Sequence, residues 1–243
     1  MGRDVTAALR ARCHGLSAGI FAANAADLGA SVTGLAGWGG DLVHFDVMDG
    51  VFVPQITAGA AFVAALGAGM LRDVHLMVAS PARHVAAFAR AGADLISVHA
   101  EAPDAAEALV ALRQAEADLA RPILAGLAVM PGTPLESLGP LLALRPDLIL
   151  VLAVDPRNSA PADLDLANQR LRLLREMTKD FAPLLAIDGG VTTKTIALAA
   201  ATGPDVIVSG SAIFGATDPA AAFAALAEGW ARGRAECAGG ADA

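Results

Sequence analysis

The 243-residue sequence has few of the features that mark secreted, membrane or nucleic-acid-binding proteins. Its only cysteines, Cys13 and Cys237, lie far apart without metal-type spacing, so we expect two reduced thiols in a cytoplasmic protein. The formal net charge is −8 and no cluster of basic residues occurs, which argues against a nucleic-acid partner. The most apolar long stretch, residues 135–154, is interrupted by charged residues and a proline, and no signal-like segment follows the first arginines. We therefore expect neither secretion nor a membrane partner.

Lysine is also scarce, and this limits the covalent chemistry that the chain can perform. A Schiff-base aldolase needs a lysine at the end of a strand, whereas Lys179 and Lys194 both fall in predicted helices. The dinucleotide-binding pattern G-x-G-x-x-G does not follow the first predicted strand. What the chain has in abundance is apolar residues, at 55%, which is enough for a large core.

Short apolar runs alternate with alanine-rich helical patterns along the chain. The runs are continuously hydrophobic, which is typical of parallel strands covered by helices; they are residues 14–22, 42–48, 74–78, 95–99, 123–129, 148–154, 184–187 and 206–208. Eight helical patterns separate or follow them, at residues 25–37, 58–71, 81–91, 103–117, 134–144, 164–180, 193–201 and 219–232.

Eight β-α units predict a single-domain α/β fold, the (β/α)8 TIM barrel. A doubly wound open sheet is the alternative, but it would not need eight units. No linker or shift in composition divides the chain, so we expect one catalytic domain over residues 1–237 and a disordered tail over 238–243.

Histidine and aspartate side chains fall at the ends of three predicted strands. His44 and Asp46 are two residues apart and therefore share one face of a strand, while His75 and Asp188 belong to two other strands. Barrel active sites form at the carboxyl ends of the strands, so we expect all four side chains to point into the barrel mouth. Each has a structural alternative, such as a hydrogen-bonded core histidine or a turn-capping aspartate. Burying carboxylates from separate strands at one point is costly, however, unless a cation compensates them.

Two histidines and two aspartates suit one divalent cation, with Zn²⁺ first and Fe, Mn, Co or Mg as alternatives. Such an ion polarises a carbonyl and stabilises an enediolate. Two carboxylates can also lie on opposite faces of the planar intermediate. If one removes a proton and the other returns a proton to the far face, the stereocentre beside the carbonyl is inverted.

Glycine pairs after the last two predicted strands indicate a phosphate site. Gly189-Gly190-Val191 follows the seventh strand and Gly210-Ser211-Ala212 follows the eighth. Barrels often bind phosphate there through backbone N–H groups. We therefore expect Gly189, Gly190, Gly210 and Ser211 to bind substrate.

The chain resembles the ribulose-phosphate 3-epimerase family in segments that run in order over nearly its whole length: residues 44–50, 52–54, 73–78, 91–94, 96–99, 131–136, 188–191 and 210–215. The resemblance implies a barrel, a divalent metal (often zinc), a ketose-phosphate substrate and a homo-oligomer. It implies that His44, Asp46, His75 and Asp188 are metal ligands and that Asp46 and Asp188 are the catalytic acid–base pair. It also implies that Met48 and Met77 line the wall against the intermediate.

The chain departs from the family pattern at several places, two of which bear on the expected substrate contacts. The family's loop after the sixth strand, of the type Asn-Pro-Gly-Phe-Gly-Gly-Gln, is replaced by residues 155–161, which contain no glycine but include Arg157. We hypothesise that Arg157 pairs with a substrate phosphate or carboxylate; the alternative is an exposed surface arginine. Gly19 stands where the family has a serine near the substrate, and Ser17, two residues back on the same face, could substitute for it in part.

The first expectation is therefore an epimerase for carbon 3 of a ketose phosphate, with D-ribulose 5-phosphate and D-xylulose 5-phosphate as the leading pair. The altered loop keeps another ketose phosphate, such as D-allulose 6-phosphate, as an alternative. A metal-assisted enediolate lyase and a non-catalytic sugar-phosphate binder are the remaining alternatives. Exchange of the substrate's carbon-bound proton with solvent would separate the binder from both enzymes.

Overall fold

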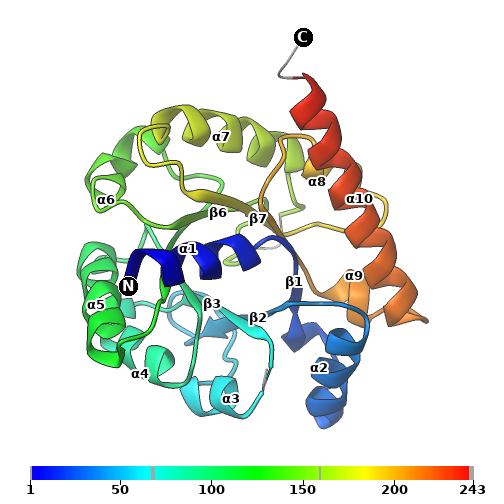
Figure 1. Ribbon diagram of the computed structural model, residues 1–243, viewed down its shortest axis with the longest axis horizontal. Coiled ribbons are helices and arrows are strands. Elements are labelled where there is room, and N and C mark those ends of the chain that lie inside the picture. The colour runs from blue at the N-terminus through cyan, green and yellow to red at the C-terminus, as the bar shows by residue number, and fades with distance from the viewer. Residues whose placement is uncertain (1, 67–68, 159, 241–243) are drawn as a thin grey trace.

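Eight parallel strands close into a barrel in chain order, with helices around the outside (Figure 1). The computed structural model describes residues 2–66, 69–158 and 160–240. The strands are β1 (Gly15–Gly19), β2 (Leu42–Met48), β3 (Leu71–Met77), β4 (Leu95–His99), β5 (Leu124–Val129), β6 (Leu148–Leu152), β7 (Leu184–Asp188) and β8 (Val206–Ser209). The pairing of β1 with both β2 and β8 closes the ring. The predicted (β/α)8 barrel is confirmed.

The covering helices are mostly shorter than their predicted spans. They are α2 (Leu28–Gly37), α3 (Ala60–Ala65), α4 (Val85–Arg90), α5 (Ala105–Leu119), α6 (Gly139–Leu142), α7 (Leu164–Met177), α8 (Ile196–Ala200), α9 (Ser211–Phe214) and α10 (Pro219–Gly240). The predicted helix over residues 58–71 is wrong at its end, because Leu71 opens β3 and pairs with Leu42. There the ladder of β2 and β3 outweighs the helix propensity of the local sequence.

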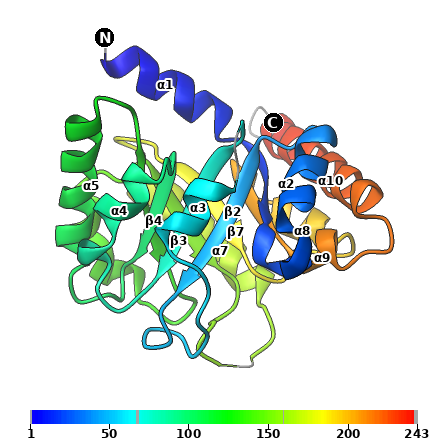
Figure 2. The ribbon, with the colours of Figure 1, turned by 90° about the horizontal axis from the view of Figure 1, so that it is seen from below.

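The predicted spans miss the short helix α9 and, at the start of the chain, the helix α1 (Gly2–Arg12). Helix α1 lies across the amino-terminal end of the barrel, opposite the loops that follow β2 and β6 (Figure 2). Its Leu9, together with Cys13, packs against the ring of inward-facing residues at the start of the strands, which includes Leu42 and Leu124. The helix therefore closes the end of the barrel away from the site. Among its residues with described side chains, Leu9 is the buried apolar one, so the local sequence carries no clear apolar stripe.

The register of β2 and β3 sorts the barrel interior into layers. Leu42 pairs with Leu71, His44 with Asp73, Asp46 with His75, and Met48 with Met77. Alternate residues of a strand point inward, so these pairs form successive layers from the amino end of the barrel to its mouth. The pair Leu42–Leu71 is deepest, the two polar pairs follow, and the pair Met48–Met77 is outermost.

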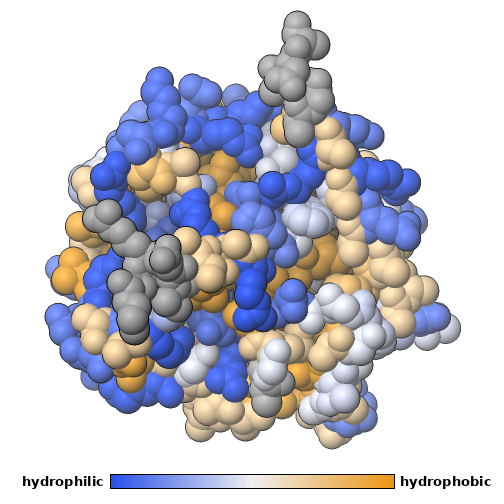
Figure 3. Space-filling model, viewed as in Figure 1, coloured by the Kyte–Doolittle hydropathy of each residue, from blue (hydrophilic) through white to orange (hydrophobic). Residues whose placement is uncertain are grey.

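The outer helices present polar faces to solvent. In α7, Leu164, Leu171 and Leu174 are buried while Arg172 and Glu176 are exposed. Hydrophilic residues accordingly gather over α7 at the upper edge of Figure 3. Among the described residues, no helix has the length and apolarity needed to cross a membrane.

The carboxyl-terminal helix α10 continues to Gly240. It thus includes residues 238–240, which the sequence placed in a disordered tail. Residues 241–243 of that predicted tail lie outside the described residues.

Candidate active site

Four predicted ligands from three strands converge at the mouth of the barrel. Each of His44, Asp46, His75 and Asp188 offers one ligand atom, and these four atoms lie within 4.8 Å of one another. The Oδ1 atom of Asp46 lies 3.2 Å from His44 Nε2 and 3.1 Å from His75 Nδ1. The Oδ2 atom of Asp188 lies 3.9 Å and 3.7 Å from the same two nitrogen atoms.

This cluster fits the geometry of a first-row divalent cation. In a tetrahedral site with ligand bonds of about 2.0–2.1 Å, neighbouring ligand atoms are separated by about 3.3–3.4 Å. The four histidine–aspartate separations, from 3.1 to 3.9 Å, bracket that value. Both imidazoles are fully buried, so their lone pairs have little access to water. The donor set of two nitrogen and two oxygen atoms is one that Zn²⁺ accepts.

The two aspartates have pKa values shifted in opposite directions. Burial disfavours the charge of Asp46, but His44 and His75 outweigh burial and hold its pKa below the ordinary value. Burial, and next the negative charge of Asp46, raise the pKa of Asp188. One site thus contains a carboxylate that favours ionisation beside one that retains a proton more readily.

His44 is held from behind by a buried carboxylate. Its Nδ1 atom lies 2.7 Å from Asp73 Oδ2, and the Ser17 hydroxyl donates to the same oxygen at 2.6 Å. Asp73 sits two residues before His75 and therefore shares its face, a spacing that is visible in the sequence. Burial opposes a charge on His44, yet Asp73 and Asp46 raise its pKa well above the ordinary value.

The contact with Asp73 changes the assignment of Ser17. Its side chain is fully buried one layer below the site, and its hydroxyl is committed to Asp73. Gly19, not Ser17, lines the cavity beside Asp46 and Asp188. A Cβ atom on Gly19 would lie 3.2 Å from the Gly210 backbone, so the close approach of the two loops favours glycine there. We therefore find no substrate-facing role for Ser17.

His75 is held from behind by a second pair, His99 and Glu101. The Nε2 atoms of His75 and His99 are 2.9 Å apart, and His99 Nδ1 lies 2.9 Å from Glu101 Oε2. Burial lowers the pKa of His99 to about 4, although Glu101 acts in the opposite direction. His99 therefore supports His75 from behind and does not itself line the cavity.

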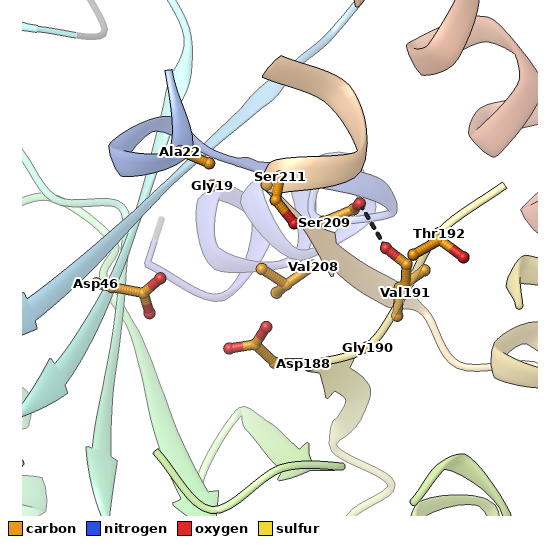
Figure 4. A pocket seen from close by; sticks show the side chains of 12 residues that line it. Gly19, Ala22, Asp46, Asp188, Gly190, Val191, Thr192, Val208, Ser209 and Ser211 are labelled. Atoms are coloured by element: carbon orange, nitrogen blue, oxygen red, sulfur yellow. Dashed lines mark hydrogen bonds between the residues drawn. The ribbon is translucent and has the colours of Figure 1, made fainter. Parts of the chain in front are cut away.

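A cavity of about 300 Å³ opens beside the cluster. Figure 4 shows Asp46 and Asp188 pointing toward one another from β2 and β7, with the turn that follows β8 on the adjacent side. All four residues expected to bind phosphate belong to its lining, which comprises Gly19, Ala22, Asp46, Asp188, Gly189, Gly190, Val191, Thr192, Val208, Ser209, Gly210 and Ser211.

The two glycines after β7 are required by backbone conformation and by close packing. Gly189 and Gly190 have φ angles of +97° and +71°, which favour glycine. A Cβ atom on Gly189 would lie 2.6 Å from the Val154 side chain, and one on Gly190 would overlap Ala162. The Ser209 hydroxyl donates to the Val191 carbonyl at 3.0 Å and ties the turns after β7 and β8 together (Figure 4).

The remaining predicted substrate contacts, Met48, Met77 and Arg157, are not among the residues that line the cavity. Met48 and Met77 are paired one layer above Asp46 and His75, with Met77 buried and Met48 half-buried. Arg157 forms a two-point ion pair with Asp155, with nitrogen–oxygen distances of 2.9 and 2.7 Å. This ion pair, foremost through its hydrogen bonds, lowers the pKa of Asp155. The Arg157 side chain is 47% exposed.

Sequence comparison relates the chain to one family, and the relatives described below carry the same enzyme name. The sequence model described as "Ribulose-phosphate 3 epimerase family" matches residues 15–214. Ribulose-phosphate 3-epimerase of Mycobacterium bovis is 41% identical over 194 residues, covering 77% of this chain and 81% of the relative. The enzyme of the same name from Bacillus subtilis is 33% identical over 204 residues, covering 82% and 91%.

Solved structures agree on the fold. The KGPDC structure from Streptococcus mutans superposes with a TM-score of 0.66 at 15% identity, covering 90% of this chain and 98% of the other. The 3-hexulose-6-phosphate synthase from Salmonella typhimurium gives a TM-score of 0.57 at 19% identity, covering 79% and 88%. At these identities the similarity establishes a shared barrel and no shared reaction.

Proposed function

The chain belongs to the ribulose-phosphate 3-epimerase family, and from this premise we propose that it inverts carbon 3 of a ketose phosphate. Named members are epimerases, so the chain is an isomerase acting on carbohydrates. Within that class, D-ribulose 5-phosphate and D-xylulose 5-phosphate are the proposed pair. A different ketose phosphate is the second choice, because the loop after β6 lacks the glycines of the family pattern.

The observation that carries this proposal is the placement of Asp46 and Asp188. They reach the cavity from β2 and β7, which are not neighbours in the barrel, and they point toward one another (Figure 4). Their pKa values are shifted apart, downward for Asp46 and upward for Asp188. Such a pair supports one group as base and the other as acid.

In one direction, we propose that Asp46 takes the proton from carbon 3 and that the carbon–hydrogen bonding electrons form the enediolate of the substrate. Asp188 then delivers its proton to the opposite face of carbon 3. The carbonyl is restored, and the configuration is inverted. In the reverse direction the two residues exchange roles.

His44, Asp46, His75 and Asp188 are the residues that would hold a divalent cation, with zinc as the first choice. When bound, a cation of this kind polarises the substrate carbonyl and favours the enediolate. Both imidazoles lie within about 3.2 Å of the same Asp46 oxygen, so the groups that would hold the cation are already close together.

The phosphate group would bind at the turns after β7 and β8. Gly189, Gly190, Gly210 and Ser211 all line the cavity, and their backbone N–H groups would be the donors to the phosphate. The absence of Cβ atoms at the three glycines lets a phosphate approach the backbone closely. We propose that this anchor fixes the distance between the phosphate and carbon 3.

Arg157 is proposed to contribute to substrate binding by exchanging Asp155 for an anionic group of the substrate. The ion pair is partly exposed, so the guanidinium can leave it at modest cost. The Arg157→Ala variant is expected to raise the KM for a phosphorylated substrate at least tenfold. An unchanged KM would show that Arg157 is a surface residue only.

The reaction is tested with a panel of ketose phosphates and the metal-loaded protein in deuterated water. Deuterium at carbon 3, together with the inverted sugar phosphate, is the expected result for the true substrate. A product with fewer carbon atoms would indicate a lyase instead. Binding without any deuterium incorporation, across the whole panel, would indicate a non-catalytic binder.

We also propose a homo-oligomer located in the cytoplasm, because family members are commonly oligomeric and because the two cysteines are unpaired. Cys13 is buried and Cys237 is exposed, and neither is in a disulfide. Light scattering of the purified protein tests the oligomeric state: a mass near 24.4 kDa would contradict it.

A further inference from the structure

A line of buried polar groups leads away from the proposed cation site on the side of β4 and β5. It begins at His75, continues to His99 and ends at Glu101. Both imidazoles are fully buried, and their rings stack with centroids 4.9 Å apart. The Phe52 ring, with its centroid 4.8 Å from that of His99, covers the group further. The line is therefore shielded from water and has fixed neighbours.

The far end of this line accepts hydrogen bonds. Glu101 Oε1 accepts from the Met130 backbone N–H at 2.9 Å and from the Thr133 hydroxyl. Its other oxygen, Oε2, faces His99 Nδ1. An ionised carboxylate has only acceptors, so His99 must donate its Nδ1–H to Glu101.

This orientation decides where the remaining protons lie. A neutral His99 that donates from Nδ1 has a lone pair on Nε2. That lone pair faces His75 Nε2 at 2.9 Å, and a single proton is needed between the two nitrogen atoms. His75 must therefore carry its proton on Nε2, and its Nδ1 lone pair points toward Asp46 and Asp188.

We propose that His99 and Glu101 are positioning residues that fix the His75 tautomer able to bind a cation through Nδ1. The proposal rests on the cation site of the proposed function. Metal-bound histidines commonly donate their other N–H to such a partner, which fixes ring orientation and basicity. Here the partner is an imidazole backed by a carboxylate.

The second ligand, His44, is anchored in a different way. Its Nδ1 faces Asp73 directly at 2.7 Å, with no intervening group. The two ligands thus have supports of different charge, a carboxylate behind His44 and a neutral ring behind His75. Loss of His99 should therefore affect His75 and leave the His44 support intact.

The test measures metal affinity, with zinc and the metal-free protein in a competition against a chelator. His99→Phe keeps a ring of similar size but removes the acceptor, and we expect zinc binding to weaken by about 10–100-fold. His99→Gln places an amide oxygen near the former Nε2, and we expect binding within about threefold of the unmodified protein. Ser97→Ala is the matched control on the same strand, because the Ser97 hydroxyl is buried without a hydrogen-bond partner in the described part of the chain. It should leave zinc affinity unchanged.

Glu101→Gln tests the end of the line. Its single carbonyl oxygen cannot serve the His99, Met130 and Thr133 donors as two carboxylate oxygens do, so we expect an intermediate loss of zinc affinity. Substitution of Co²⁺ adds a spectroscopic measurement, since the visible absorption band should shift in His99→Phe and not in Ser97→Ala. Neither measurement depends on turnover.

Nitrogen NMR of the zinc-loaded, unmodified protein reads the tautomers directly and does not depend on whether a variant folds. We expect protons on His75 Nε2 and His99 Nδ1. The opposite tautomers, or zinc affinity in His99→Phe equal to that of the unmodified protein, would overturn the proposal. If the unmodified protein itself binds no divalent cation, the cation site of the proposed function fails; if it binds one and the His99 variants bind it equally, only the present inference fails.

Discussion

Replacement of Asp188 by asparagine should make the metal-free protein more stable while it removes turnover. Asp188 is one of two carboxylates in a buried cluster whose ligand atoms lie within 4.8 Å of one another. Among the described side chains, no hydrogen bond to its carboxylate is found. The Asp188→Asn change therefore removes a charge without breaking a hydrogen bond.

The magnitude follows from Coulomb's law. Two unit negative charges no more than 4.8 Å apart repel by at least about 3.5 kcal/mol at an effective dielectric constant of about 20. Attraction from the imidazoles, 3.7 and 3.9 Å away, offsets part of this repulsion. The net pKa shift of Asp188 is upward, so burial and repulsion prevail over attraction. We expect a gain of about 1–2 kcal/mol in the free energy of unfolding and a loss of about 10²–10⁴-fold in kcat.

The sign of the pH dependence is fixed by the same shift. A carboxyl group whose pKa is raised by folding binds more protons in the folded state than in the unfolded state. The metal-free protein should therefore lose stability as pH rises from the unfolded pKa of Asp188, near 3.9, through its raised folded pKa. The Asp188→Asn protein should lack this pH-dependent loss of stability. The difference in the free energy of unfolding between the variant and the unmodified protein should therefore increase as pH rises.

Chelator-treated protein is unfolded with urea at several pH values, and epimerisation is followed separately with D-ribulose 5-phosphate. The matched control is Asp180→Asn, because the Asp180 side chain is 67% exposed and pairs with Arg145 at the surface. That control should change neither kcat nor the pH dependence. Full turnover in Asp188→Asn would contradict the two-carboxylate mechanism, and a less stable metal-free protein would contradict the electrostatic reasoning.

The other predictions concern the opposite carboxylate, the phosphate turn and the thiols. Asp46→Asn should also abolish turnover, but it should destabilise the protein by about 1–3 kcal/mol, because the imidazoles favour the charged form; urea unfolding at neutral pH measures this. Gly190→Ala should raise KM for the phosphorylated substrate and lower stability by about 1–2 kcal/mol, because its φ is +71° and a Cβ atom would overlap Ala162. An unchanged KM would place the phosphate elsewhere. At pH 8, iodoacetamide should label exposed Cys237 and leave Cys13, whose pKa burial raises to about 12; mass spectrometry counts the labels.

The order of elements could be read from the sequence because it depends on local patterns. Continuous apolar runs of strand length between alanine-rich helical patterns are typical of parallel strands with covered faces. The same argument could not find α1, whose burial depends on closing the far end of the barrel through Leu9. It also placed Leu71 in a helix, since only pairing with Leu42 makes that residue the start of a strand.

The candidate site could be predicted as far as the spacing of residues along a strand determines which way their side chains point. His44 and Asp46 share a face because they are two residues apart, and the structure brings them to His75 and Asp188 as expected. The same spacing misled at Ser17, which does share a face with Gly19 but lies one layer deeper against Asp73. The direction of a side chain follows from the local alternation along its strand, whereas its depth in the barrel depends on the stagger of neighbouring strands.

By itself, then, the sequence determined the kind of fold and the residue types at the barrel mouth, because apolar periodicity and strand alternation act over a few residues. Only the tertiary structure decided which polar groups support them. Asp73 behind His44, and His99 with Glu101 behind His75, become partners through the register of β2, β3 and β4. Those contacts join segments distant in the chain, and their geometry is set when the barrel closes.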